Sequence, residues 1–401
     1  MPWIELEGAA NARDLGGLPT AGGGKTIGGR LLRSDNLQEL SPADVAILVQ
    51  EVGLTTVVDL RSTAELAAEG PAPLDAVPGV RHVHHPVLPL GQHLAERLGV
   101  PAVVAQPAPT LVPTSEFLSP AWPCRGPRIL NRPSYHAARQ LTGAWCRRDI
   151  DRWRRDVLAL PRRPGRHDPL VSCDGTPVTV LHAFSAHVVP RPADWPATAH
   201  VTGYWRLPAA AGWSPPRRLA EFLEACEPVV YIGFGSMPSP DPERLAAAIT
   251  TAADQVGVRA LVASLSPALR RLLPADRFLV IRNAPHDWLF PRVRAIVHHG
   301  GAGTAGAAAV AGRPQVIWPF GVDQHFWAER MADLGVAPPA LPVRALTGPA
   351  LAAVLDRALT DPRLAERAAG LGSRVRAEDG AGAAVFRLEQ VGAGIPTAVD
   401  A

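Results

Sequence analysis

Two segments in the C-terminal half place glycines and polar side chains directly after short apolar stretches. The segment 233–236 (GFGS) follows the stretch VVYI, and the segment 298–304 (HHGGAGT) follows AIV and precedes a run of alanines. Glycines let a backbone approach a phosphate closely, and a helix that begins in the second segment would direct free N–H groups at an anion. Ser236, His298 and Thr304 add side-chain donors. Together the segments predict a diphosphate site; a tight turn in the first and buried histidines in the second are the structural alternatives.

A third polar segment follows the apolar stretch QVIWPF. Asp323 and Gln324 place a carboxylate and an amide there. These groups accept hydrogen bonds from and donate them to the hydroxyls of a hexose, which is the polar pair that sugar recognition requires. The segment therefore predicts a sugar site beside the diphosphate site.

These polar segments are spaced along a regular alternation of apolar strands and amphipathic helices, which begins near residue 217. Such an alternation is typical of a parallel sheet covered by helices on both faces, and such sheets bind ligands at the carboxyl ends of their strands. The sequence predicts a doubly wound nucleotide-binding domain. The expected strands are PVVYIGFGS, RALVASL, RFLVIRN, RAIVHHG and QVIWPF, and the expected helices include RLAEFLEAC and DPERLAAAITTAADQVG.

The middle of the chain, about 90–200, is rich in proline and arginine. A helix is predicted over 136–158, because apolar side chains recur there at helical spacing. Its arginines are expected to form a solvated face, with an anion-binding role as the alternative. The apolar positions are Trp145, Ile150, Trp153 and Val157, and the arginines are Arg147, Arg148, Arg152, Arg154 and Arg155.

Nearer the N-terminus the sequence predicts a helix followed by a strand. Ser41 and Pro42 indicate the start of the helix, because serine caps helices well and proline suits their first turn. The segment 54–60 (LTTVVDL) is the strand, since it is rich in β-branched residues.

Composition limits the class of protein. With 401 residues, 47% of them hydrophobic, and a mean hydropathy of +0.05, the chain can form two globular domains. The chain has 40 lysine and arginine residues against 37 aspartate and glutamate residues, so it lacks the large excess of positive charge that is typical of a nucleic-acid binder. The opening segment does not resemble a signal peptide, and the weakly polar stretch 295–312 is too polar to span a membrane. Widely spaced cysteines argue against a zinc site or disulfide scaffold and favour the cytoplasm; they are Cys124, Cys146, Cys173 and Cys226.

The segment 283–331 (NAPHDWLFPRVRAIVHHGGAGTAGAAAVAGRPQVIWPFGVDQHFWAERM) resembles the donor-site signature of family 1 glycosyltransferases, of the sterol 3-β-glucosyltransferase and antibiotic glycosyltransferase type. The resemblance covers about 91–392. It implies a GT-B-like α/β fold with a donor-binding domain over 201–401 and a remnant of the acceptor domain over 90–200.

The same resemblance implies an activity. A hexosyltransferase of this type moves a hexose from a nucleotide diphosphate sugar, here a UDP- or dTDP-hexose as co-substrate, to a hydroxyl of a lipophilic, sterol-like or polyketide-like acceptor. No metal or further cofactor is implied. Peripheral contact with a membrane stays open, because the acceptor is lipophilic.

The resemblance also implies roles for individual residues. Plant relatives carry a ribose-binding glutamate where this chain has Gly306, and the segment 264–266 (SLS) replaces a usual Gly-Trp. Ribose and nucleotide recognition must therefore use other groups. The implied contacts are diphosphate binding by Ser236, His298, Gly301, Gly303 and Thr304, sugar binding by Asp323 and Gln324, and base binding by Ala284, Pro285 and His286, mostly through their backbone groups.

Residues 1–89 resemble the beginning of bacterial tyrosine/serine protein phosphatases. Three blocks match in order: 11–17 (NARDLGG), 29–35 (GRLLRSD) and 55–65 (TTVVDLRSTAE). The sequence lacks that family's thiolate loop, HCxxGxxR. Cys146 and Arg152 match C-x5-R formally, but the match has no glycine and lies in a predicted helix.

The two resemblances meet near residue 90, and each lacks the part that holds its family's catalytic group. The N-terminal α/β part is thus predicted to be truncated and atypical, with a phosphatase-like fragment over 1–89. No catalytic residue is assigned; His82, His84 and His85 are the clustered candidates for a general base, and a solvated strand end is their alternative. The sequence predicts a glycosyltransferase. The alternatives are a catalytically impaired nucleotide-sugar-binding protein that arose by gene fusion and, third, a phosphatase.

Overall fold

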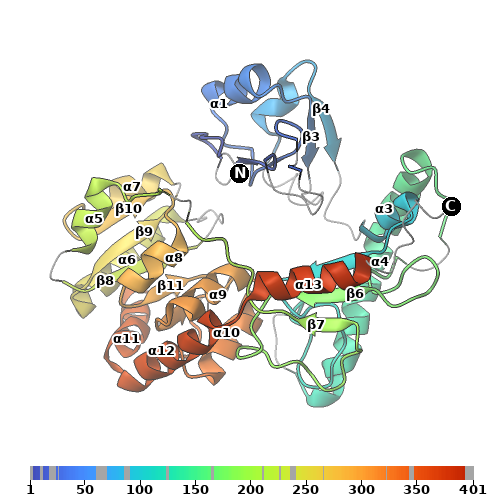
Figure 1. The fold of residues 1–401 in the computed structure, drawn as a ribbon. Helices are drawn as coiled ribbons and strands as arrows, with labels where there is room; N and C mark the ends of the chain where they lie inside the picture. Colours follow the sequence, from blue (N-terminus) through green and yellow to red (C-terminus); the bar gives the residue numbers. More distant parts are fainter. Residues whose placement is uncertain are drawn as a thin grey trace. The chain divides into compact units, whose positions relative to one another are not determined.

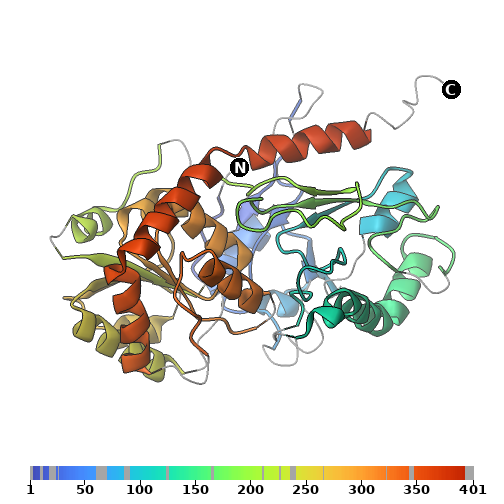
Figure 2. The ribbon, with the colours of Figure 1, turned by 90° about the horizontal axis from the view of Figure 1, so that it is seen from below.

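The computed structural model divides the chain into two compact units, 1–88 and 89–401, which are described separately (Figures 1 and 2). Within the described residues, no helix is long and apolar enough to cross a membrane. The described residues are 3–9, 12–17, 24–25, 27–59, 70–84, 91–122, 126–163, 167–209, 212–224, 227–234, 241–264, 266–321, 323–342 and 347–392.

The first unit is organised around the buried carboxylate of Asp44. This carboxylate accepts hydrogen bonds from the N–H groups of Glu7 at 2.7 Å, Gly8 at 2.8 Å and Ser41 at 2.9 Å. Ser41 caps the first helix, so the predicted helix start is confirmed, and the predicted strand is present as β3. The elements are β1 (Arg13–Asp14) and β2 (Leu32–Arg33), which pair antiparallel, α1 (Pro42–Ala46), η1 (Ile47–Glu51), β3 (Thr56–Asp59), η2 (Pro73–Ala76) and β4 (Arg81–His84), which pairs in parallel with β3.

The second unit begins with a small parallel sheet of strand order β5-β6-β7. Phe184, just after β6, packs against Trp327 of the C-terminal half with ring centroids 5.8 Å apart. Ser185 donates a hydrogen bond to Glu378 at 2.8 Å, so the small sheet is joined to the C-terminal half by apolar and polar contacts. Its elements are α3 (Gly91–Leu98), β5 (Val103–Gln106), η3 (Arg128–Leu130), α4 (Asn131–Asp156), β6 (Thr179–His182) and β7 (Ala199–Val201).

The long helix α4 corresponds to the helix predicted over 136–158. Ile150 and Trp153 are buried as expected, but Val157 lies beyond the last residue of the helix and is exposed. The prediction of a solvated arginine face is wrong at Arg154, of which only 1% is exposed. Arg154 follows the buried Trp153 and lies one turn after Ile150, so it is on the inward side of the helix. The exposed arginines are Arg147, Arg148, Arg152 and Arg155, and the Trp145 side chain lies outside the described part.

The C-terminal half contains a parallel sheet of strand order β10-β9-β8-β11-β12. The chain runs outward from β8 to β10, returns to the other side of β8 as β11 and ends the sheet with β12, which is the doubly wound order that the sequence predicted. The strands are β8 (Val229–Gly233), β9 (Arg259–Ala263), β10 (Phe278–Ile281), β11 (Ile296–His298) and β12 (Gln315–Ile317).

Helices cover both faces of this sheet (Figure 1). Val230 packs into a buried cluster with α6 and α11, whereas its neighbour Tyr231 packs with α5, α8 and α9 on the other face. This division follows from the alternation of side chains along a strand. The helices are α5 (Arg217–Leu223), α6 (Pro242–Val256), α7 (Pro267–Leu272), α8 (His286–Leu289), η4 (Phe290–Arg292), α9 (Ala302–Ala311), α10 (Gln324–Asp333), α11 (Gly348–Thr360), α12 (Pro362–Arg376) and α13 (Gly380–Gly392).

The inward position of Arg154 can be tested against that of its exposed neighbour Arg152. We expect Arg154→Ala to lower the free energy of unfolding by about 3–5 kcal/mol, because Glu96 would lose the partner of a largely buried ion pair. Arg152→Ala should change it by less than about 0.5 kcal/mol. Urea titrations followed by tryptophan fluorescence measure both values, and equal effects would contradict the inward placement.

Candidate functional site

The predicted polar segments meet at one edge of the large sheet. His298 ends β11 and is paired in register with Gly233 at the end of β8 and with Ile317 at the end of β12. The segments that follow these three strands are therefore neighbours, as a doubly wound sheet requires. Ser236 belongs to the first of these segments but lies outside the described residues, so its role stays a prediction.

His298 is a buried structural residue rather than a group that faces the edge. Its side chain is fully buried, its Nε2 lies 2.9 Å from Oε1 of Gln315, and its Nδ1 accepts a hydrogen bond from the Gly300 N–H at 3.0 Å. Burial lowers the pKa of His298 to about 3, so the ring is neutral at neutral pH. Because both ring nitrogens have protein partners, this geometry does not support the expected contact between His298 and a diphosphate.

His299 is the histidine of this pair that lies among the candidate binding groups. Burial lowers its pKa, while the Asp323 carboxylate and the Gly233 backbone oppose that shift. The ring therefore lies near both the sugar-binding segment and the end of β8. Among the described residues, its Nδ1 is buried without a hydrogen-bond partner, which distinguishes it from His298.

Three glycines near His299 differ in whether the structure leaves space for a side chain. Gly300 has a φ of +92°, and a Cβ there would lie 2.8 Å from Cγ2 of Ile317 and 3.0 Å from the Gln324 carbonyl oxygen. A Cβ on Gly301 would lie 2.4 Å from Nε2 of His299. A Cβ on Gly303 would meet nothing within 4 Å, so packing does not require that glycine.

The N-terminus of α9 lies directly beyond these glycines. Gly301 is its N-cap residue and provides no side-chain cap, and the half-buried Thr304 lies in the first turn. The first N–H groups of a helix have no partner within the helix and favour an anion. The helix start can therefore contribute to binding a phosphate, as the sequence predicted for this segment.

Asp323 and Gln324 begin α10 at the same edge. Oε1 of Gln324 accepts hydrogen bonds from the N–H groups of Phe320 at 2.7 Å and Gly321 at 3.2 Å. The amide oxygen is thus turned toward the backbone, and the NH₂ group is the part of Gln324 suited to a ligand. Asp323 accepts a hydrogen bond from Nε1 of Trp327 at 2.9 Å through Oδ2, which fixes the carboxylate.

Ala284 and Pro285 lie between β10 and α8, and His286 is the first residue of α8. The His286 ring stacks on Phe290 with centroids 4.1 Å apart, and burial lowers the pKa of His286 to about 4. This side chain is occupied by packing, so a contact from this segment to a base would have to use the backbone. That expectation agrees with the sequence analysis but stays a prediction.

Gly306 packs closely against the ring of Tyr204. A Cβ at this position would overlap the Tyr204 ring, whose Cε1 is 2.5 Å away. Tyr204 is buried, and burial raises the pKa of its hydroxyl. A glutamate at 306 would therefore clash with Tyr204, which gives a steric reason for the glycine.

An aromatic cluster at the same edge was missed by the sequence reasoning. Phe234 follows β8 and packs edge-to-face on Trp318 at 5.3 Å and on Phe320 at 5.8 Å, and these two residues follow β12. Phe320 is 38% exposed. The signal was available, since all three aromatic residues lie within the segments predicted as strands, PVVYIGFGS and QVIWPF.

The other chemical candidates are held in structural roles. Nδ1 of His82 lies 2.8 Å from Asp75 and its Nε2 lies 3.0 Å from the Leu74 carbonyl oxygen, so both ring nitrogens are engaged. Cys146 lies inside α4, where burial raises the pKa of the thiol, so the formal C-x5-R match forms no phosphate cradle. The His84 side chain, His85, Cys124 and Cys226 lie outside the described part. Cys173 and Cys146 are free thiols, and the described residues contain no His, Cys, Asp or Glu group that could hold a metal ion.

Two family models match parts of the chain. Residues 251–391 match the erythromycin biosynthesis protein CIII-like C-terminal domain, and residues 4–117 match the tyrosine phosphatase family. Both matches agree with the resemblances that the sequence suggested. The phosphatase match continues past residue 89, where the sequence analysis placed a boundary that stays a prediction.

Curated relatives support the same assignment for the C-terminal part. A sterol 3-beta-glucosyltransferase of Arabidopsis thaliana is 35% identical over 294 residues, which cover 73% of this chain and 45% of that protein. O-mycaminosyltylonolide 6-deoxyallosyltransferase of Streptomyces fradiae is 36% identical over 262 residues, which cover 65% of this chain and 60% of that protein. The chain therefore spans about half the length of these relatives.

Solved structures confirm the GT-B-like α/β fold. The kitacinnamycin glycosyltransferase aligns with a TM-score of 0.54 at 20% identity, over 82% of this chain and 79% of that one. The calicheamicin glycosyltransferase CalG4 aligns with a TM-score of 0.50 at 20% identity, over 83% of this chain and 79% of that one. The chain thus combines a C-terminal part similar to sterol and antibiotic glycosyltransferases with an N-terminal part similar to tyrosine phosphatases.

Gly300 and Gly303 form a matched pair for testing the geometry of the loop. Gly300→Ala should lower the free energy of unfolding by at least about 1 kcal/mol, because the new Cβ meets Ile317 and the left-handed backbone is strained. Gly303→Ala should leave stability unchanged or raise it by up to about 1 kcal/mol, because alanine favours a helix and the space is open. Thermal denaturation measures both, and a tolerated Gly300→Ala would contradict the loop described here.

Proposed function

We propose that this chain is a hexosyltransferase that moves a hexose from a nucleotide diphosphate sugar to a hydroxyl of a lipophilic acceptor. The observation that supports this most directly is the convergence of His299, the N-terminus of α9 and the segment of Asp323 and Gln324 at one edge of the sheet. The relatives act on a sterol and on a macrolide-like lactone by their names, which makes a lipophilic acceptor the natural proposal.

The diphosphate would be held by the free N–H groups of α9 and by His299. His299 is a neutral hydrogen-bond donor at neutral pH, because burial lowers its pKa. Donors aimed at the departing diphosphate stabilise the charge that develops as the bond to the sugar breaks. His298 would support this site indirectly, by fixing the Gly300 backbone through its Nδ1.

The hexose would be recognised by one hydrogen-bond donor and one hydrogen-bond acceptor. The NH₂ group of Gln324 would donate to a hydroxyl, since its amide oxygen is bound to the backbone of Phe320 and Gly321. The carboxylate of Asp323 would accept from a second hydroxyl, since an ionised carboxylate only accepts hydrogen bonds. The nucleotide, UDP or dTDP, would lie toward Ala284 and His286.

His299→Ala tests the proposed diphosphate contact. We expect the Kd for UDP-glucose or dTDP-glucose to rise about tenfold to hundredfold, because a hydrogen bond to a charged group contributes about 1.5–3 kcal/mol. Isothermal titration calorimetry measures the Kd, and the exposed histidine on α4, as His136→Ala, is the matched control. An unchanged Kd for His299→Ala would remove this residue from the proposal.

Transfer of the hexose to an acceptor is tested separately from donor binding. Product formation from UDP- and dTDP-hexoses is measured by mass spectrometry against a panel of sterols and polyketide lactones, with Asp323→Ala as the control for donor-site chemistry. Transfer that is lost in Asp323→Ala would support the hexosyltransferase. Donor binding without transfer to any acceptor would favour the impaired nucleotide-sugar-binding protein, and no binding would contradict both.

A further inference from the structure

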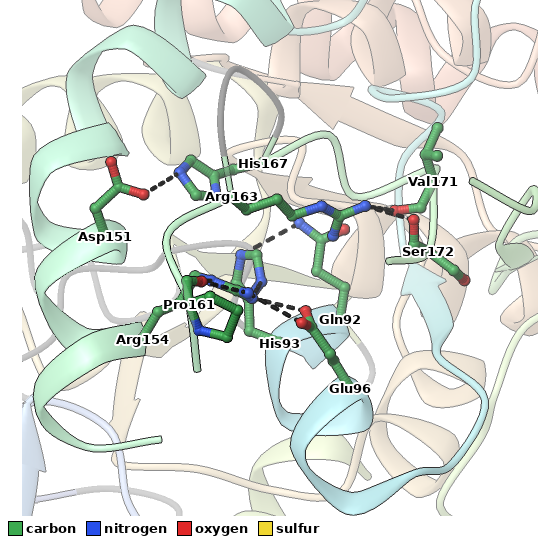
Figure 3. Close-up of polar contacts among 10 residues, drawn as sticks. All are labelled: Gln92, His93, Glu96, Asp151, Arg154, Pro161, Arg163, His167, Val171 and Ser172. Carbon is green, nitrogen blue, oxygen red and sulfur yellow. Dashed lines mark hydrogen bonds and ion pairs between the residues drawn. The ribbon is translucent and has the colours of Figure 1, made fainter. Parts of the chain in front are cut away.

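A second polar cluster lies in the acceptor-remnant part of the chain, outside the proposed donor site (Figure 3). It joins α3, the C-terminal end of α4 and the segments 161–163 and 167–172. Its ionisable side chains come from all three segments, and several of them are buried. They are His93, Glu96, Asp151, Arg154, Arg163 and His167.

Arg154 is the centre of this cluster because all five of its N–H groups have acceptors. Nη1 and Nη2 donate to the two carboxylate oxygens of Glu96 at 2.7 and 3.0 Å. Nε and Nη2 donate to the Pro161 carbonyl oxygen at 3.2 and 2.9 Å, and Nη1 also donates to Nδ1 of His93 at 2.8 Å. One guanidinium thus fastens α3 and the chain at 161 to α4.

The contact to His93 fixes the protonation state of that ring. A guanidinium only donates hydrogen bonds, so Nδ1 of His93 must accept, and the single proton of the neutral ring lies on Nε2. The Gln92 side-chain amide lies 3.4 Å from this Nε2 and must present its oxygen to that proton, an orientation in which amide O and N are exchanged. A second proton would have to go on Nδ1, where it would face the Arg154 donor across 2.8 Å. Burial, and after it the charge of Arg154, lower the pKa of His93 to about 4.

His167 extends the cluster to the third segment. Its ring lies edge-to-face on the His93 ring at 5.2 Å, and its Nε2 is 3.3 Å from Oδ1 of Asp151. Burial lowers the pKa of His167, whereas Asp151 opposes the shift. The other oxygen of Asp151 accepts a hydrogen bond from Arg162 at 3.1 Å, so this carboxylate is shared between His167 and Arg162.

The remaining charges around the two rings are mostly positive. Arg163, whose charge also lowers the pKa of both histidines, donates to the carbonyl oxygens of Val171 and Ser172. Next to His167, Asp168 is paired with Arg139 of α4 at 3.0 Å. Glu96 is bound by Arg154, and Asp151 is shared with Arg162, so neither carboxylate can neutralise two imidazolium rings.

We propose that this cluster is an acid-sensitive clamp, which holds α3 and the segments 161–163 and 167–172 on α4 at neutral pH and releases them when His93 and His167 take up protons. The buried Arg154 supplies the attachment, and the two neutral rings are the groups that acid converts into like charges beside it.

The direction of the effect follows from the pKa values. A histidine whose pKa is lowered in the folded state binds fewer protons than in the open state, so its contribution to stability is complete above about pH 6.5 and is lost as the pH falls toward the folded pKa. For His93, with a pKa of about 4, opening should become about 30-fold more favourable between about pH 7.5 and about pH 5. His167 adds to this change in the same direction.

Hydrogen exchange of the intact chain, measured by mass spectrometry and corrected for the intrinsic exchange rate, tests the clamp. We expect peptides over 91–98 and 151–156 to show the roughly 30-fold increase in opening between about pH 7.5 and about pH 5, while α11 stays protected. A change of less than about threefold, or equal opening of α11, would overturn the proposal.

Two further measurements distinguish the clamp from a general folding defect: hydrogen exchange of histidine variants, and a pH titration of His93 in the unmodified chain. The double variant His93→Gln/His167→Gln keeps polar side chains that cannot take up a proton, so its exchange should be nearly independent of pH, whereas the exposed His136→Gln should behave as the unmodified chain. A variant that keeps the full pH response would overturn the proposal. In the unmodified chain, the histidine NMR signal of His93 should titrate well below 6.5, and titration at or above that value would also overturn it.

Discussion

The candidate site depends on one buried imidazole. His298 ends β11, binds Gln315 of β12 through Nε2 and accepts the Gly300 N–H through Nδ1. The strand pairing and the turn that follows it are thereby fixed by a single side chain. A buried polar group without a partner costs about 1–3 kcal/mol, so this arrangement persists only while both bonds are made. The adjacent His299 and the start of α9 take their positions from it.

The same constraint operates in the other parts of the chain. In the first unit, the carboxylate of Asp44 gathers three backbone N–H groups. In the second, Arg154 satisfies all of its donors with Glu96, His93 and the Pro161 carbonyl. In each case a buried polar side chain joins segments distant in sequence, which apolar packing alone would leave less specifically placed. In contrast to these groups, Nδ1 of His299 is buried without a hydrogen-bond partner among the described residues.

The chain combines parts that are similar to two different protein families. The C-terminal part is similar to glycosyltransferases and the N-terminal part to tyrosine phosphatases, and the described residues include neither a phosphatase loop nor an assigned base for sugar transfer. Donor binding is therefore better supported than turnover. The described residues of the donor edge belong to the second unit and lie at the ends of β8, β11 and β12 and in the helices that follow them.

The sequence by itself determined the doubly wound sheet, its strands, the start of α9 and the neighbouring positions of the glycine-rich and Asp-Gln segments, because periodicity and strand order are local properties that the chain carries along its length. It could not decide which of two adjacent histidines is buried, since β11 ends between them and their directions depend on the strands alongside. It placed Arg154 in solvent, although its spacing from Ile150 is that of the inward side of the helix, because the sequence gives no sign that Glu96 of a distant helix would pair with it. The sequence also gave no indication that the Tyr204 ring packs against Gly306. These outcomes depend on contacts between distant segments, and only the tertiary structure brings those segments together.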